Sequence, residues 1–107
     1  MELLGKTVVV TGGGRGLGRA YCESLAKQGA NVVAADIRDT GSTVEAVKTS
    51  GGQAIGVHLD VTDASSCDDM AKAAIAAYGR IDSLVNNACL LYTSDAADDT
   101  PCVDLGG

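Results

Sequence analysis

The sequence of 107 residues contains no Phe and no Trp, only three Tyr, one Pro and one His. Its apolar content, 46% of the residues, therefore comes mostly from Ala, Val, Leu and Ile. Small aliphatic side chains together with 14 glycines suit helices packed closely on a parallel sheet whose strands are buried on both faces. The composition predicts the α/β class, and the length allows one domain at most.

Positive charge is also scarce, because 8 Lys and Arg stand against 14 Asp and Glu and give a formal net charge of −6. The missing basic stripe excludes nucleic acid and anionic membrane surfaces as partners. No apolar run approaches the roughly 20 residues of a membrane span, and the first residues do not resemble a signal peptide. The expected location is the cytoplasm.

Metal-ligand patterns are absent as well. The cysteines, Cys22, Cys67, Cys89 and Cys102, form no CxxC pair, and His58 is the single histidine. No ligand set for a metal follows from these positions. Reduced cysteines without a shared role are expected, since disulfides are rare in the cytosol.

β-Branched runs alternate with helical patterns as far as residue 88. Strands are expected within KTVVVTG, NVVAAD, QAIGVHLDV and RIDSLVNNA. Helices are expected between them, and Ser42 could cap the second helix and Ser65 or Asp63 the third. The pattern predicts a Rossmann-like three-layer αβα arrangement, the N-terminal half of a doubly wound parallel sheet with strand order 3-2-1-4.

Hydrophobic spacing in the first expected helix predicts which of its faces is buried. The apolar residues that share one side are Leu17, Ala20, Tyr21, Leu25 and Ala26. We expect this face to pack on the sheet.

A glycine-rich stretch, TGGGRGLG from Thr11 to Gly18, joins the first expected strand to the first helix. Glycines there let the backbone turn and approach a pyrophosphate, while unpaired amides at the helix start attract negative charge. The stretch satisfies TGxxxGxG but not GxGxxG, and it lacks the Lys and Ser or Thr of a P-loop. Its position between a strand and a helix favours dinucleotide binding over a plain turn.

Asp36 closes the second expected strand, about 20 residues beyond the glycine stretch. A carboxylate there would accept hydrogen bonds from the 2′ and 3′ hydroxyls of the adenosine ribose and would repel a 2′-phosphate, which favours NAD over NADP. Arg15 and Arg38 argue the other way, because both could reach a phosphate. The structural alternative for Asp36 is a solvated carboxylate at a strand end.

These stretches, with LDV at residues 59–61 and VNNA at residues 85–88, resemble the short-chain dehydrogenase/reductase family in order and spacing. The resemblance covers residues 3–88. The cofactor-binding residues that the pattern and the resemblance indicate are Thr11, Gly12, Gly14, Arg15, Gly16, Leu17, Gly18, Asp36, Ile37, Asp60, Val61, Asn86, Asn87 and Ala88.

The resemblance also implies a role for each group of residues. Residues 15–17 would line the pyrophosphate, Asp36 would hold the ribose, and Asp60 with Val61 would flank the adenine. Asn87 and Ala88 would lie under the cofactor ribose, and Asn86 would brace the centre of the sheet. Without the family, Asp60 reads as a strand-end carboxylate and the two asparagines as a turn signal.

Catalytic residues are not expected in this chain. The family's Ser and its Tyr with a Lys four residues later lie beyond VNNA, and no YxxxK occurs here. Tyr21, Tyr78 and Tyr92 are therefore expected to be packing or surface residues. By resemblance, the whole protein would transfer a hydride between NAD and a small alcohol or carbonyl substrate as a homodimer or homotetramer, and this part alone would be inactive. The alternatives are a non-catalytic dinucleotide-binding sensor and a stand-alone binding module.

The last nineteen residues, 89–107, differ in character from the rest. The family expects Gly where Cys89 stands, and the words CLLYTSDAAD and CVDLGG resemble a translated frame of sequencing-adapter DNA. The interpretation is a partial NAD(P)-binding domain over residues 1–88 and a non-native, disordered tail over 89–107. A natural acidic tail is the alternative. With the sheet ending at its fourth strand, we expect an open, aggregation-prone edge.

Overall fold

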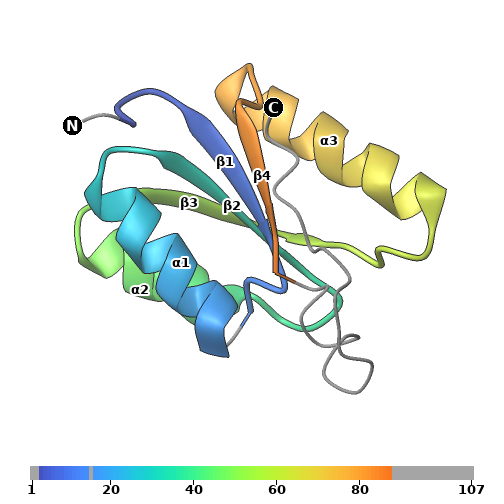
Figure 1. Ribbon diagram of the computed structural model, residues 1–107, viewed down its shortest axis with the longest axis horizontal. Coiled ribbons are helices and arrows are strands. Elements are labelled where there is room, and N and C mark those ends of the chain that lie inside the picture. The colour runs from blue at the N-terminus through green and yellow to red at the C-terminus, as the bar shows by residue number, and fades with distance from the viewer. Residues whose placement is uncertain (1–2, 15, 88–107) are drawn as a thin grey trace, which may run out of the picture.

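A parallel sheet of four strands lies at the centre of the computed structural model, which describes residues 3–14 and 16–87 (Figure 1). Its strands are β1 (Thr7–Thr11), β2 (Asn31–Asp36), β3 (Gln53–His58) and β4 (Ser83–Asn86). They pair in parallel in the order β3-β2-β1-β4. The predicted strand order is confirmed.

Helices cover both faces of this sheet. α1 (Gly16–Lys27) and α2 (Gly41–Thr49) lie on one face, and α3 (Ala64–Tyr78) lies on the other (Figure 1). Alternate strand residues serve the two faces: Val8, Val10, Val32 and Ala34 pack with Cys22, Ala26 and Val47, whereas Val9, Val33 and Ala35 pack with Leu59 and Ala74. Because successive strand side chains point to opposite faces, the unbroken runs of Val and Ala supply both cores. The predicted αβα layers are confirmed.

The buried face of α1 matches the predicted one in part, because Ala26 is buried and Leu25 packs against the core. Gly18, Cys22 and Ala26 are its buried residues, whereas Leu17 and Tyr21 are 53% and 38% exposed. The prediction from hydrophobic spacing favoured the larger apolar side chains. At its start, however, the helix lies too close to the glycine loop to leave room for them. A Cβ on Gly18 would collide with the carbonyl oxygen of Gly12. Small side chains therefore occupy the contact beside the loop, and Leu17 and Tyr21 are exposed.

Helix ends follow the predicted signals in part. Asp63 caps α3 by accepting a hydrogen bond of 2.9 Å from the Ser65 amide, one of the two predicted options. Ser42 is not the cap of α2, because the residue before that helix is Thr40, whose side chain makes no capping hydrogen bond.

Asp82 fastens the start of β4 to the start of β1. Its Oδ2 accepts a hydrogen bond of 2.8 Å from the Thr7 amide, and its own amide donates to the Thr7 carbonyl at 2.8 Å. Arg80 pairs with the other carboxylate oxygen at 2.7 Å. Within the part of the chain that the structure describes, β1 is the single neighbour of β4.

The predictions for residues 89–107 lie outside the described residues. Among the helices that the structure does describe, none is long and apolar enough to span a bilayer.

Candidate functional site

The carboxyl ends of all four strands meet at one edge of the sheet. Thr11 pairs with Ala35 on one side and with Asn86 on the other, and Asp36 pairs with His58. Residues that follow these strand ends therefore share the edge, which is where ligands bind in open α/β sheets. The fold brings together predicted residues from four separate parts of the sequence.

The loop between β1 and α1 has room for glycine and for little else. Gly12 and Gly16 have φ angles of 69° and 58°, in the left-handed region that favours glycine. A Cβ on Gly13 would lie 3.0 Å from the Val10 carbonyl oxygen, and one on Gly14 would lie 2.8 Å from Asp36 Oδ2. At Gly16, by contrast, an added Cβ would meet nothing within 4 Å, so the start of α1 is open, which suits a pyrophosphate.

Asp36 is tied to this loop by its carboxylate. Its Oδ2 accepts a hydrogen bond of 2.9 Å from the Gly14 amide, and its Oδ1 accepts one of 3.0 Å from the Arg38 amide. Each carboxylate oxygen can accept a further hydrogen bond. Asp36 is therefore a positioned carboxylate next to the loop, and Ile37 beside it is 58% exposed.

Two asparagines at the end of β4 contact β1 and the glycine loop. The Thr11 hydroxyl donates to Asn86 Oδ1 at 3.1 Å, which joins the ends of the two strands. Asn87 Nδ2 donates to the Gly12 carbonyl at 3.3 Å. Asn87 is 9% exposed, and its Oδ1 is buried with no hydrogen-bond partner among the described residues. An unpaired buried amide oxygen is costly, so this position fits one that a bound donor, such as a ribose hydroxyl, completes.

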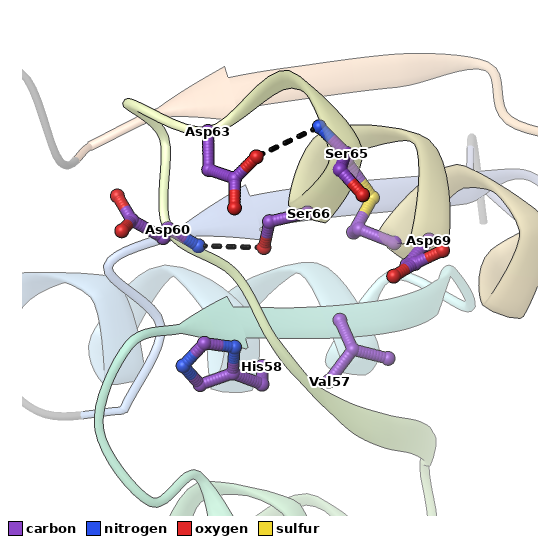
Figure 2. A pocket seen from close by; sticks show the side chains of 8 residues that line it. Val57, His58, Asp60, Asp63, Ser65, Ser66 and Asp69 are labelled. Atoms are coloured by element: carbon purple, nitrogen blue, oxygen red, sulfur yellow. Dashed lines mark hydrogen bonds between the residues drawn. The ribbon is translucent and has the colours of Figure 1, made fainter.

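Asp60 and Val61, which were predicted to flank one ligand together, line two different pockets. Asp60 lines a pocket of about 480 Å³ between the end of β3 and the start of α3, where its amide donates to the Ser66 hydroxyl (Figure 2). Val61 lines a pocket of about 460 Å³ that also touches Thr11 and Asn86. In this structure Asp60 and Val61 therefore line separate pockets, which share Met70.

A local turn holds the Asp60 carboxylate. Oδ1 accepts hydrogen bonds from the hydroxyl and the amide of Thr62, at 2.6 and 3.0 Å. These two contacts lower the pKa of the Asp60 carboxyl below its usual value. The side chain is thus a local turn acceptor in this structure.

The remaining predicted residues fall into two groups. Gly16 and Leu17 are exposed at the start of α1, while Arg15 and Ala88 lie outside the described residues. Seven of the predicted residues form the connected part of the site: Thr11, Gly12, Gly14, Gly18, Asp36, Asn86 and Asn87.

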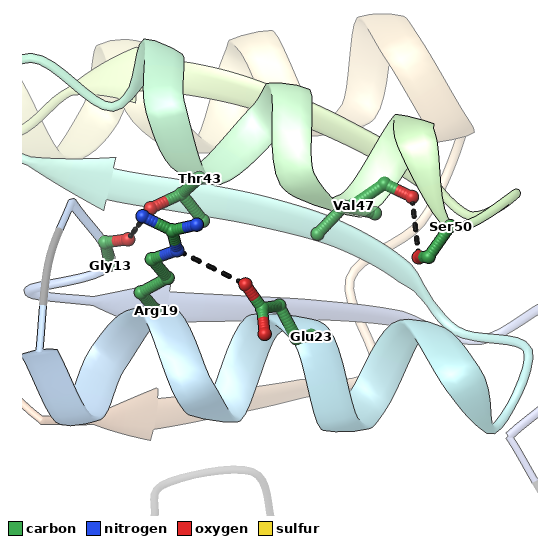
Figure 3. A network of polar contacts seen from close by, with 6 residues as sticks. All are labelled: Gly13, Arg19, Glu23, Thr43, Val47 and Ser50. Atoms are coloured by element: carbon green, nitrogen blue, oxygen red, sulfur yellow. Dashed lines mark hydrogen bonds and ion pairs between the residues drawn. The ribbon is translucent and has the colours of Figure 1, made fainter.

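Sequence reasoning missed two residues of this site, Gly13 and Thr43. The Thr43 hydroxyl, fully buried on α2, donates to the Gly13 carbonyl at 2.7 Å (Figure 3). Gly13 occupies a variable position of the TGxxxGxG pattern, so the pattern passes over it. The available signal was a hydroxyl four residues before the buried Val47, on the same face of α2.

Residues 6–102 match the family model described as short chain dehydrogenase. The chain belongs to the short-chain dehydrogenase family. It is 43% identical over 91 residues to the peroxisomal hydratase-dehydrogenase-epimerase of Neurospora crassa, with 85% of this chain and 10% of that protein covered. It is 41% identical over 93 residues to the short-chain dehydrogenase/reductase homolog YusS of Bacillus subtilis, with 84% of this chain and 85% of that protein covered.

The fold resembles solved short-chain dehydrogenases. A short-chain dehydrogenase/reductase from Burkholderia phymatum in complex with NAD superposes with a TM-score of 0.74 at 38% identity, covering 80% of this chain and 31% of that one. This short-chain dehydrogenase chain therefore spans about a third of that structure. The family match crosses residue 88, and the division predicted there rests on the sequence alone.

Other chemistry on this short-chain dehydrogenase is limited in the part that the structure describes. No group of three or more His, Cys, Asp or Glu side chains is placed to hold a metal there. Cys22 and Cys67 are free thiols. Tyr78 packs against the α3 side of the core, and burial raises the pKa of its hydroxyl.

Proposed function

We propose that this chain binds the dinucleotide of an NAD-dependent short-chain dehydrogenase along the carboxyl edge of its sheet. The pyrophosphate would lie at the glycine loop and the start of α1, and the adenosine ribose would lie at Asp36. The observation that carries the proposal is the Asp36 carboxylate held 2.9 Å from the Gly14 amide, because it places a ribose acceptor directly beside the loop. When bound, the cofactor supplies or accepts the hydride.

The proposed contacts come from three parts of the edge. The loop and the helix start contribute Thr11, Gly12, Gly14, Arg15, Gly16, Leu17 and Gly18. The end of β2 contributes Asp36 and Ile37, and the later strand ends contribute Asp60, Val61, Asn86, Asn87 and Ala88. Asp60 would first have to turn away from Thr62 to reach an adenine shared with Val61.

A preference for NAD over NADP follows from the charge at the ribose position. The Gly14 and Arg38 amides hold both oxygens of the Asp36 carboxylate. Ribose hydroxyls can donate to such oxygens, whereas a 2′-phosphate brings negative charge against them. The exposed Arg38 side chain opposes this preference.

The proposed reaction belongs to the whole protein. Its substrate would be a small alcohol or carbonyl compound, its location the cytoplasm, and its assembly a homodimer or homotetramer. This chain would supply the cofactor half over residues 1–88 and be inactive alone, with residues 89–107 a non-native tail. The sensor alternative is not favoured, because the relatives are named dehydrogenases.

An NMR titration of the isotope-labelled chain with NAD and with NADP tests the proposal. We expect NAD to shift the amide signals of Gly12, Gly14 and Asp36 at lower concentration than NADP. Asp36→Asn should reduce the ratio of NADP to NAD dissociation constants about tenfold, which corresponds to about 1.4 kcal/mol. Asp39→Asn is the matched control, since that exposed carboxylate caps only the nearby Gly41 amide. Tighter binding of NADP, or no shift with either nucleotide, would contradict the proposal.

A further inference from the structure

One peptide group in the glycine loop is held at one end by the last residue of β2 and at the other end by a residue of α2. The carbonyl of Gly13 and the amide of Gly14 belong to the same planar peptide unit. The carbonyl accepts the Thr43 hydroxyl at 2.7 Å, and the amide donates to Asp36 Oδ2 at 2.9 Å. The Gly13 amide is also bound, to the Ala35 carbonyl at 3.1 Å. The loop is therefore joined to both β2 and α2.

This peptide has little intrinsic reason to keep its orientation. It joins two glycines, which reach a wider range of backbone angles than other residues and can reorient at low cost. A rotation of the peptide plane would turn the Gly14 amide away from Asp36 and the Gly13 carbonyl away from α2. The contacts at its two ends therefore decide its orientation.

The Thr43 hydroxyl supplies the hydrogen bond at the carbonyl end of this peptide. It is 0% exposed and lies on the face of α2 that also buries Val47, so no competing water reaches it from bulk solvent. A valine of the same shape would leave the Gly13 carbonyl facing two methyl groups, and an unpaired buried acceptor favours reorientation. The hydroxyl, and not the volume of the side chain, is what the loop requires.

We propose that Thr43 is a positioning residue that locks the Gly13–Gly14 peptide and thereby keeps Asp36 and the glycine loop in one geometry. The inference rests on the proposed function, since it assigns the loop and Asp36 to one cofactor. It places a determinant of dinucleotide affinity on α2, away from the residues proposed to touch the ligand. Thr43 therefore acts on Asp36 through the Gly13–Gly14 peptide, which binds both residues.

Three variants of the full chain test this lock: Thr43→Val, Thr43→Ser and, as a matched control on the same helix, Thr49→Val at an exposed site. NMR-detected hydrogen exchange reads the Gly14 amide, and titration reads NAD affinity. In Thr43→Val we expect exchange at Gly14 to accelerate and NAD to bind about tenfold more weakly, with the core amide of Val33 unchanged. Thr43→Ser should show the exchange at Gly14 and the NAD affinity of the unsubstituted chain, and Thr49→Val should change neither quantity.

The result that would overturn the inference is a Thr43→Val chain with wild-type exchange at Gly14 and wild-type NAD affinity, or a serine variant that restores neither. If the valine variant fails to fold, Thr43→Ala against Thr43→Ser makes the same comparison, because these two differ by one hydroxyl. If exchange accelerates as expected but the unsubstituted chain does not bind NAD, the proposed function fails and the lock stands.

Discussion

Replacing Gly18 with alanine tests the close approach of α1 to the glycine loop. The added Cβ would collide with the Gly12 carbonyl oxygen, and it would lie 2.7 Å from the Gly12 carbonyl carbon and 2.9 Å from Asn87 Nδ2. Two of these three atoms belong to the backbone, so no side-chain rotation relieves the contact. The start of α1 would have to move away from the loop.

The sign of the change in the free energy of unfolding distinguishes the effect of packing from the effect of helix propensity. Alanine in place of a helical glycine stabilises by about 0.5–1 kcal/mol when nothing else changes. An overpacked site loses about 1–3 kcal/mol, and backbone neighbours place this site in the upper part of that range. We expect the Gly18→Ala chain to lose about 1–2 kcal/mol of its free energy of unfolding.

Urea unfolding followed by circular dichroism measures this difference by linear extrapolation. Ser24→Ala, an exposed position in the same helix, is the matched control and should gain about 0.5 kcal/mol from propensity alone. A Gly18→Ala chain as stable as the wild type, or more stable, would refute the argument that close packing is the reason for this glycine.

Three further outcomes follow from the structure. Thr7→Val should raise the free energy of unfolding by about 1 kcal/mol, because the Thr7 hydroxyl is fully buried without a partner among the described residues. A lower free energy of unfolding, measured by urea unfolding, would contradict this. Burial raises the pKa of the Cys22 thiol to about 12, so mass spectrometry after a short maleimide pulse at pH 8 should find Cys67 modified before Cys22. Labelling of Cys22 as early as Cys67 would contradict this and would show that the α1 face opens. Hydrogen bonds from Arg80 and the Thr7 amide lower the pKa of Asp82, so its contribution is present above the unfolded pKa of about 3.9 and disappears as pH falls through the folded value. The acid loss of stability should therefore be shallower in Asp82→Asn, and an unchanged pH profile would exclude that contribution.

The strands were predictable because each is marked by a local run of residues. Their order was predictable because general rules govern parallel sheets. The run KTVVVTG carries β-branched residues at every buried position of β1, and NVVAAD carries Val and Ala at the buried positions of β2. Right-handed crossovers then leave few ways to order parallel strands. Asp36 and Asn86 could be placed at one edge for the same reason, since each closes a strand.

Contacts between side chains and distant backbone were not predictable in this way. Thr43 reaches Gly13 across 30 positions, and no periodicity connects them. The Asp60 carboxylate turned to Thr62 because a nearby hydroxyl and amide satisfied it locally. The packing of α1 was predicted correctly for Leu25 and Ala26 but not for Leu17 and Tyr21, since hydrophobic spacing takes no account of how closely a helix approaches its neighbour.

Two long-range hydrogen bonds between the ends of the β1 and β4 segments indicate an order of folding. Asp82 to Thr7 and Asn87 to Gly12 each close 75 positions of chain, whereas β1, β2 and β3 can pair one after another as they leave the ribosome. Closing a long loop costs more entropy and is slower than closing a short one, so we expect the Gly12 carbonyl to receive its hydrogen bond from Asn87 only after β1, β2 and β3 have paired. A ribosome stalled before this point would hold a nascent chain whose sheet is started but whose β1 strand still lacks its β4 neighbour.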